Sequence, residues 1–167
     1  KESLLPVIVF SFSKKKCEEC ADTLRSLDLL GTDEKVAVHH HVTAVVRRLR
    51  ASETKLPQVA RLAETLKRGV GILHEGLIPI MREMVEVLFA SGFVRVLFTT
   101  EGFAALGVNA PARTVVFNGL RKHDGRGFRD LLAGEYTQMA GRAGRRGHDR
   151  VGTVIITCWN DVPPLAS

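Results

Sequence analysis

The chain has 167 residues, which is enough for one domain that buries a substantial core. Hydrophobic residues make up 45% of the sequence and charged residues 25%, as in ordinary soluble globular proteins, and no apolar run is long enough to predict a membrane-spanning helix. The net charge of +6 favours a polyanionic partner, and its excess is gathered in patches that favour a nucleic-acid-binding face, at residues 14–16, 47–50, 121–129 and 142–150.

The first predicted elements are a strand and a helix that follow each other directly. Residues 6–12, Pro-Val-Ile-Val-Phe-Ser-Phe, form a continuous apolar run, which is typical of a strand buried on both faces. Ser13 offers a cap for a helix whose apolar positions recur at helical spacing, at Cys17, Cys20 or Ala21, Leu24 and Leu27. Backbone N–H groups and lysines at 14–16 could bind a phosphate at this junction, although an exposed basic first turn explains them equally well.

The three cysteines, Cys17, Cys20 and Cys158, give an odd number with no framework for disulfides, which favours a reducing compartment. Cys17 and Cys20 have the spacing of half a zinc site, but no second pair completes it. Positions i and i+3 of a helix share one face, so core packing is the favoured interpretation and we expect no metal site in this chain. No signal peptide is visible, and the first residue is not Met, so we expect a part of a larger protein.

Residues 29–68 are predicted to be a helical insertion within an α/β frame. One helix starts after Gly31 and runs through Val36, Val45, Val46 and Leu49. The histidines at 39–41 point about 100° apart on that helix, so they are predicted to form a solvated face and not a metal site. A second helix opens at Pro57 and closes at Gly69, with inward residues Val59, Leu62, Ala63 and Leu66.

Strands and helices alternate from residue 70 onward. We predict strands at 70–73, 94–99, 113–117 and 152–157, and helices at 79–91 and 134–142. The first of these helices is expected to turn Ile80, Met84, Val87 and Leu88 inward. This alternation predicts a parallel sheet with helices on both faces, with ligands bound outside the carboxyl ends of the strands.

A ten-residue stretch at 138–147, Gln-Met-Ala-Gly-Arg-Ala-Gly-Arg-Arg-Gly, has the clearest chemical character. Arg142, Arg145 and Arg146 lie among Gly and Ala residues, which let a guanidinium approach a phosphate closely. The planar fork of donors on Arg fits phosphate oxygens. The alternative is a solvated basic helix end that the helix dipole favours.

This stretch resembles the last conserved motif of superfamily 2 helicases, Gln-x-x-Gly-Arg-x-Gly-Arg. The resemblance implies that Gln138, Arg142 and Arg145 belong to an ATP site, which they reach from the second RecA-like lobe. Arg142 and Arg145 fall on the catalytic positions of the motif. The last matched arginine, Arg145, corresponds to the arginine finger, which stabilises charge on the transferring phosphoryl group.

Other segments are similar to superkiller-type DExH-box RNA helicases, at residues 9–15, 56–59, 121–125 and 134–138. The resemblance implies that residues 1–167 are the second RecA-like (helicase C-terminal) lobe of a larger ATP-driven motor that unwinds RNA from 3′ to 5′. Such proteins feed RNA to the exosome. Expected partners are RNA, the first RecA-like lobe of the same chain, superkiller complex subunits and the exosome, with no membrane.

The compartment is predicted from one short segment. Arg-Lys-His-Asp at residues 121–124 favours the cytoplasmic superkiller branch over its nuclear relative, in which the His is typically replaced.

Two loops depart from the family pattern. The family turn His-His-Gly-Gly or His-His-Ser-Gly is here Leu-His-Glu-Gly at residues 73–76, which puts a carboxylate beside a presumed RNA phosphate. The stretch at 99–109 has one extra residue, and Gly102 stands where the family has Thr. The resemblance still implies RNA contacts and nucleotide contacts from residues on these loops and at the first helix start: Ser13, Lys14, Gly76, Thr100 and Glu101 for RNA, Gly107 and Asn109 for ATP.

The sequence has no Gly-x-x-x-x-Gly-Lys-Ser/Thr loop and no Asp-Glu-x-His box. We therefore expect Mg²⁺ to be held mainly by a first lobe that precedes this one, and the chain alone to be inactive toward ATP. Alternatives are a non-catalytic RNA-binding scaffold lobe, or the lobe of a related nuclear RNA helicase or DNA-repair helicase. A phosphate-binding loop upstream of Lys1 would separate the motor from the scaffold.

Overall fold

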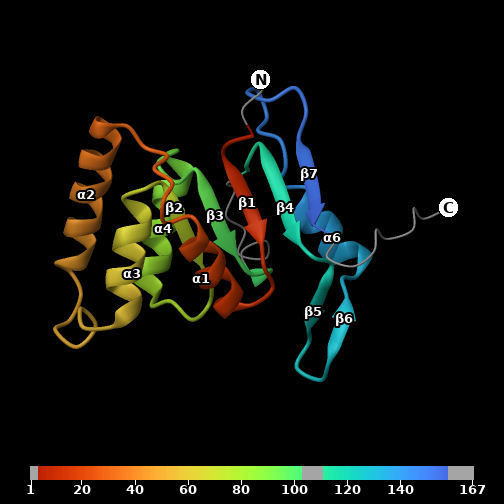
Figure 1. The fold of residues 1–167 in the computed structure, drawn as a ribbon, viewed down its shortest axis with the longest axis horizontal. Helices are drawn as coiled ribbons and strands as arrows, with labels where there is room; N and C mark the ends of the chain where they lie inside the picture. The colour runs from red at the N-terminus through yellow and green to blue at the C-terminus, as the bar shows by residue number, and fades with distance from the viewer. Residues whose placement is uncertain (1–3, 103–110, 158–167) are drawn as a thin grey trace.

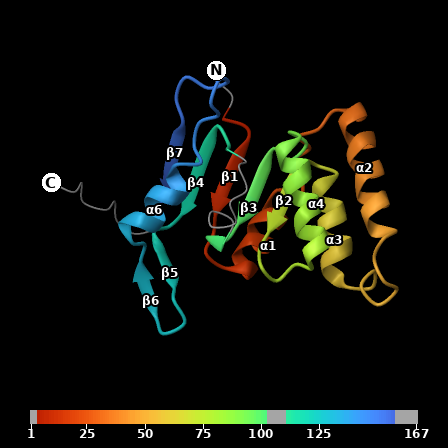
Figure 2. The same ribbon diagram turned by 180° about the vertical axis from the view of Figure 1, so that it is seen from behind.

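The computed structural model describes residues 4–102 and 111–157. Its centre is a parallel five-stranded sheet with strand order β2-β3-β1-β4-β7 (Figure 1). The helix α1 lies on one face of the sheet, and α4 and α6 lie on the other (Figures 1 and 2). The predicted RecA-like parallel sheet with helices on both faces is confirmed. The sheet strands are β1 (Val7–Phe10), β2 (Val70–Leu73), β3 (Val96–Thr99), β4 (Thr114–Asn118) and β7 (Thr153–Thr157).

The central strand β1 is flanked on both edges by strands much later in the chain. Val7 pairs with Val96 of β3 on one side and with Thr114 of β4 on the other. Ile8 and Phe10 are fully buried, and the ring of Phe10 stacks on Phe117 with centroids 5.8 Å apart. Val7 and Val9 on the other face are partly buried, so neither face of β1 is open to solvent and the run at residues 6–12 carries almost no polar side chains.

The helices are α1 (Lys14–Thr23), α2 (Thr32–Val46), α3 (Pro57–Leu66), α4 (Pro79–Ala90) and α6 (Ala133–Ala140). The helix α1 begins directly after Ser13, as predicted, but the Ser13 side chain makes no capping hydrogen bond. Cys17 and Ala21 are buried beneath α1, and burial raises the pKa of the Cys17 thiol to about 12. Leu27 lies beyond the helix end and is exposed, so its predicted inward position is wrong.

The predicted helical insertion at residues 29–68 contains two helices with different roles. The helix α3 packs on β2 and therefore helps to cover the sheet, whereas α2 packs on α3 and α4 at the edge of the molecule (Figure 1). The buried residues of α2 are Val38, Val42 and Val45, and Val36 is exposed. His39 and His40 are also exposed, in agreement with a solvated face.

The helix α4 has its buried face shifted from the predicted one. Met84 and Leu88 are buried as expected, but Val87 is exposed and Ile80 is only partly covered. Met81, Val85 and Phe89 are buried in their place. Both the sheet and α2 contact this helix. Its buried face is therefore wider than the single apolar stripe that the sequence predicts.

A small antiparallel hairpin stands apart from the main sheet and was not predicted. It consists of β5 (Arg121–His123) and β6 (Phe128–Asp130), joined by a loop in which Gly125 has a φ of +97°. The hairpin projects beyond the carboxyl end of β4 (Figure 1). Its strands carry mostly charged residues, so hydrophobic alternation gave no signal for it. The Asp-Gly pair at residues 124–125, which is typical of hairpin loops, was the available signal.

Candidate functional site

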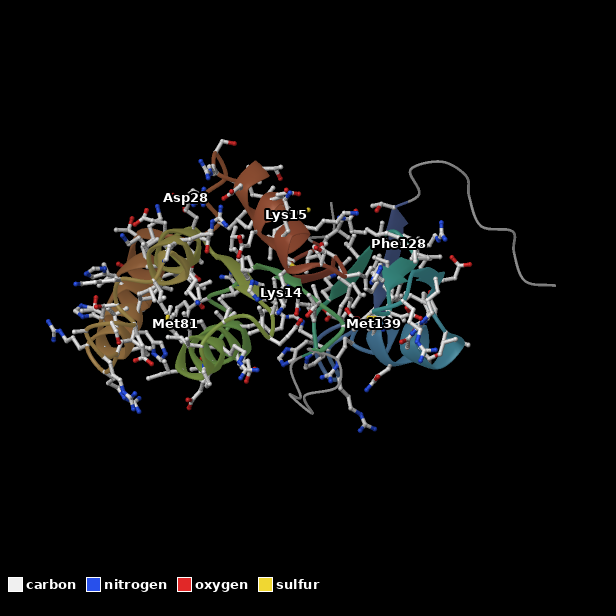
Figure 3. The ribbon with its side chains drawn as sticks, turned by 90° about the horizontal axis from the view of Figure 1, so that it is seen from below. Lys14, Lys15, Asp28, Met81, Phe128 and Met139 are labelled. Carbon is white, nitrogen blue, oxygen red and sulfur yellow. The ribbon has the colours of Figure 1, made fainter. Side chains whose placement is uncertain are left out.

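A groove of about 650 Å³ lies at the carboxyl ends of β1, β3 and β4. Figure 3 looks onto this edge, with Lys14 near its middle and Phe128 on the hairpin side. Four of the five predicted RNA-binding residues line the groove: Ser13, Lys14, Thr100 and Glu101. The fifth, Gly76, lies next to it, because a Cβ at this position would be 3.2 Å from Cδ of Lys14. The structure therefore brings the predicted RNA-binding residues together.

The turn after β2 is held by a buried histidine. The Gly76 N–H donates to Nδ1 of His74 at 3.1 Å, so the proton of a neutral His74 lies on Nε2. Nε2 faces Oε1 of Glu18 at 3.5 Å. A Cβ on Gly76 would also come within 3.2 Å of the His74 ring, so glycine permits the close approach between this turn and α1. The sequence did not predict a role for His74.

The carboxylate of Glu75 faces the groove. The Thr100 hydroxyl donates to Oε2 of Glu75 at 3.0 Å, and Nζ of Lys14 lies 3.4 Å from Oε1. Partial burial favours the neutral form of this carboxyl, but hydrogen bonds from the backbone and from Thr100, together with Lys14, outweigh it and hold the Glu75 pKa below its usual value. The side chains of Lys14 and Thr100, two of the predicted RNA-binding residues, are thus in contact with the Glu75 carboxylate.

A charged network connects the groove to α6. Nζ of Lys122 lies 3.1 Å from Oε1 of Glu101 and 2.7 Å from Oε1 of Glu135. Arg129 donates to both carboxylate oxygens of Glu135 at 2.8 Å, and the Leu132 N–H at the start of α6 donates to the same carboxylate at 2.9 Å. The hydrogen bonds from Arg129 and Lys122 lower the pKa of Glu135 far below its usual range. Glu101 at the groove is therefore joined through the hairpin to the helix that precedes the arginines.

The hairpin also gives the groove an aromatic wall. Phe128 is 71% exposed, and its ring meets that of His123 edge-on, with centroids 5.3 Å apart. Arg121 lines the groove beside them. An exposed aromatic ring next to cationic side chains offers a surface on which nucleobases can stack.

The arginine-rich segment is fixed against the beginning of β4. The Ala112 N–H donates to the Arg142 carbonyl at 2.9 Å, and the Gly144 N–H donates to the Ala112 carbonyl at 2.7 Å. Gly152 runs so close to this segment that a Cβ there would lie 2.4 Å from the Ala143 carbonyl oxygen. These backbone contacts give the segment one defined path after α6 ends.

The side chain of Arg145 is bound by Asp149. Nε and Nη2 of Arg145 donate to the two carboxylate oxygens at 2.8 and 3.0 Å, and the Arg145 backbone N–H donates at 2.9 Å. The Asp149 side chain is only 2% exposed, and the Arg145 guanidinium holds its pKa well below the usual range. Arg145 and Arg146 line a second hollow of about 560 Å³, beside Pro6 and Pro111 at the amino ends of β1 and β4.

The other predicted ATP-site residues are placed as follows. Arg142 is half-buried on the same segment as Arg145, and Gln138 is exposed on the last turn of α6. Gly107 and Asn109 lie outside the described residues. Within residues 4–102 and 111–157, the groove and the second hollow share no lining residue, so Arg145 lies at the opposite edge of the sheet from the predicted RNA-binding residues.

Two further observations concern the described parts of the chain. None of their helices is long and apolar enough to cross a membrane. They also contain no group of three or more His, Cys, Asp or Glu residues arranged to hold a metal ion.

The chain is similar to known helicases over nearly its whole length. Residues 39–147 match the helicase conserved C-terminal domain. The chain is 56% identical over 98% of its length to the Arabidopsis thaliana DExH-box ATP-dependent RNA helicase DExH11, and 56% identical over 97% to the human superkiller complex protein 2. It is 50% identical over 95% of its length to the human exosome RNA helicase MTR4. The chain spans only 12–15% of the length of these relatives.

Proposed function

The chain belongs to the helicase conserved C-terminal domain family, and from this we propose that it is the second RecA-like lobe of an ATP-dependent RNA helicase of the superkiller type. In the proposal, residues 1–167 form one lobe of a longer protein that moves 3′ to 5′ along RNA. The observation that carries the proposal is the pairing of a defined arginine segment with a separate basic groove on the same sheet.

The groove would bind the RNA backbone. Lys14 and the Thr100 hydroxyl supply donors, and Ser13 and Gly76 contribute the backbone at the start of α1 and at the turn after β2. Glu101 would act beside them by holding Lys122 in the hairpin wall. Contacts of this kind fix the register of the strand and read no base edges, so the groove would accept any sequence.

The arginine segment would complete an ATP site whose other wall belongs to the first lobe. Arg145 would serve as the arginine finger, and Arg142 would bind the phosphates. Gln138, Gly107 and Asn109 would also contact ATP. The cationic donors of this segment suit phosphate oxygens and not a metal ion, so Mg²⁺ would be held mainly by the first lobe. On this proposal the isolated chain is inactive.

The proposed setting is exosome-linked RNA decay in the cytoplasm. The link to the exosome is supported by the names of two relatives, the human superkiller complex protein 2 and the human exosome RNA helicase MTR4. The cytoplasm is proposed from Arg-Lys-His-Asp at residues 121–124, the form that resembles the superkiller branch. Partners would be RNA, superkiller complex subunits and the exosome. The alternative is the same lobe of a related nuclear RNA helicase.

The test is RNA-stimulated ATP hydrolysis by the full-length protein with single arginine substitutions. We expect Arg145→Lys to lower kcat by about a thousandfold or more, because Lys keeps the charge but loses the planar fork that stabilises the transferring phosphoryl group. Arg142→Lys should also impair hydrolysis and raise KM for ATP.

Arg146→Lys is the matched control, since Arg146 is exposed and contacts the same hollow. Near-normal hydrolysis is expected for it. An essential Arg146 beside a dispensable Arg145 would show that the motif is aligned one residue out of register.

If all three variants hydrolyse ATP normally, the lobe is a non-catalytic scaffold. That second candidate is favoured by one observation, the Glu75 carboxylate in the groove. A preference for DNA over RNA would instead point to a DNA-repair helicase.

A further inference from the structure

Three side chains from distant parts of the sequence meet in the groove. Lys14 comes from the first turn of α1, Glu75 from the turn after β2, and Thr100 from the end of β3. The Glu75 carboxylate lies between the other two, with Oε1 3.4 Å from Nζ of Lys14 and Oε2 3.0 Å from Oγ1 of Thr100. Both of its oxygens are therefore in contact with groups that would otherwise face an incoming anion.

The backbone around Glu75 directs its side chain into the groove. The Gly76 N–H is bound to His74, and the Leu77 N–H donates to the His74 carbonyl at 3.1 Å, so the turn is closed around a buried ring. On the far side of the carboxylate, a Cβ on Gly102 would lie 3.8 Å from Oε2 of Glu75. The carboxylate thus lies between Lys14 and the backbone of Gly102.

We propose that Glu75 sets the RNA affinity of this groove by competing with an RNA phosphate for Lys14 and Thr100. The inference rests on the proposed function, in which those two residues bind the RNA backbone. A phosphate and a carboxylate both accept hydrogen bonds and both carry negative charge, so they cannot share the same two donors at close range without repulsion. RNA must displace the Glu75 side chain to gain both contacts.

The geometry allows this displacement. The Glu75 side chain is 59% exposed, and that of Lys14 is 51% exposed, so the pair is open to solvent and held weakly. Rotation of Glu75 outward costs one exposed ion pair and the hydrogen bond from Thr100. The result is a groove that binds RNA in every sequence context but less tightly than Lys14 and Thr100 alone would allow.

The experiment measures binding of a labelled single-stranded oligouridylate to the full-length protein by fluorescence anisotropy over a series of salt concentrations. Glu75→Gln removes the charge and keeps the shape. The matched control is Glu19→Gln on α1, where the carboxylate is 60% exposed and lies 3.7 Å from Nζ of Lys15 but contacts no groove donor. Both variants change the net charge of the protein by the same amount.

We expect Glu75→Gln to tighten RNA binding about threefold to tenfold at low salt, because a like charge is removed from contact distance of the phosphate. Glu19→Gln should change the affinity by less than about twofold. The plot of log affinity against log salt should become steeper by up to about 0.7 for Glu75→Gln, since Lys14 becomes free to replace a counterion on single-stranded RNA. A structural role for Glu75 alone would not change this slope.

Thr100→Val gives a second, independent readout. In the wild-type background the Thr100 hydroxyl is already bound to Glu75, so its loss should weaken RNA binding only slightly. In a Glu75→Ala background the hydroxyl is available to the phosphate, and the same substitution should weaken binding several times more. Equal effects in the two backgrounds would contradict the competition.

The remaining outcomes separate this inference from the proposed function. If Lys14→Ala and Thr100→Val weaken binding but Glu75→Gln behaves like Glu19→Gln, the groove binds RNA and the inference is wrong. If none of these variants changes the affinity, the assignment of the RNA track is wrong. If Glu75→Gln weakens RNA binding and leaves DNA binding unchanged, the carboxylate accepts a bond from the ribose 2′-OH, which also overturns the competition.

Discussion

At the residue scale, a single acidic side chain holds the guanidinium of Arg145 in one orientation. The almost fully buried Asp149 binds two guanidinium N–H groups and the backbone N–H of the same residue. This bidentate contact raises the pKa of Arg145 further and fixes the plane of its fork. Two of the five guanidinium N–H donors bind Asp149, which leaves the other three to bind a ligand at the hollow that Arg145 lines. Asp149 is therefore a positioning residue in the proposed ATP site.

Replacement of Asp149 tests this role at the residue scale. In Asp149→Asn one of the two acceptor oxygens becomes a donor, so the guanidinium loses its fixed plane. We expect kcat for RNA-stimulated ATP hydrolysis to fall about tenfold to a hundredfold, as for a catalytic group misplaced by about 1 Å, with little change in RNA affinity. Asp149→Glu, which keeps the charge, should recover part of the loss. Unchanged kcat in Asp149→Asn would show that the ion pair serves folding only.

At the scale of elements, the hairpin of β5 and β6 connects two functional regions. Its Lys122 contacts Glu101 at the groove and Glu135 on α6, and its Arg129 holds Glu135 by both oxygens. The helix α6 leads into the arginine segment at its other end. A movement of Glu101 on RNA binding would therefore change contacts at the start of the helix that precedes the arginines.

The network also predicts a pH dependence of stability. The pKa of Glu135 is lowered in the folded state, so its contribution is fully present above the unfolded value, about 4.3, and is lost as the pH falls toward the folded value. Glu135→Gln should lower the free energy of unfolding by about 1 kcal/mol at pH 7, where charged hydrogen bonds are lost. The difference in the free energy of unfolding between Glu135→Gln and the wild type should shrink as the pH is lowered from 5 to 3. Denaturant titrations at each pH measure it, with Glu19→Gln as the control.

The same elements explain what could be predicted from the sequence. The sheet strands were predicted to within about two residues at each end, because runs such as residues 70–73 are apolar and bounded by glycine or polar residues. The hairpin was missed because its strands carry mostly charged residues and show no hydrophobic alternation. Lys14 and Thr100, which the family resemblance implied as RNA contacts, both line one groove at the strand ends, where the general rule for parallel sheets puts ligands. The direction of the Glu75 side chain depends on geometry that no spacing encodes, whereas Arg145 and its partner Asp149 are only four residues apart, a spacing that could have been considered.

At the scale of the whole molecule, the sheet separates two hollows. The groove lies at the carboxyl ends of the strands, and the arginine hollow lies at the amino ends of β1 and β4. The proposed phosphate donors from this lobe are cations and backbone groups, which can bind a nucleotide but cannot hold its magnesium ion. The lobe is thus proposed to bind RNA at the carboxyl edge of the sheet. At the amino edge it would stabilise charge on the transferring phosphoryl group.

The isolated 167-residue chain should therefore bind RNA without hydrolysing ATP. We expect weak binding that is indifferent to base sequence, and an affinity that falls steeply between 50 and 200 mM salt, as for contacts dominated by phosphate. Hydrolysis should not exceed the background of a preparation purified to remove contaminating ATPases. Robust turnover by the pure chain, or an affinity insensitive to salt, would contradict the one-lobe assignment.

The position of β1 has a consequence for biosynthesis. This strand leaves the ribosome first among those of the sheet, yet it needs β3 on one edge and β4 on the other. Roughly 100 residues separate it from β4, so at about 5–20 residues per second its apolar segment waits some 5–20 s for its second neighbour. During that interval Ile8 and Phe10 lack their native contacts with β4. The nascent chain is then a natural client for chaperones that bind short apolar stretches, and slower translation between residues 10 and 114 would lengthen that exposure.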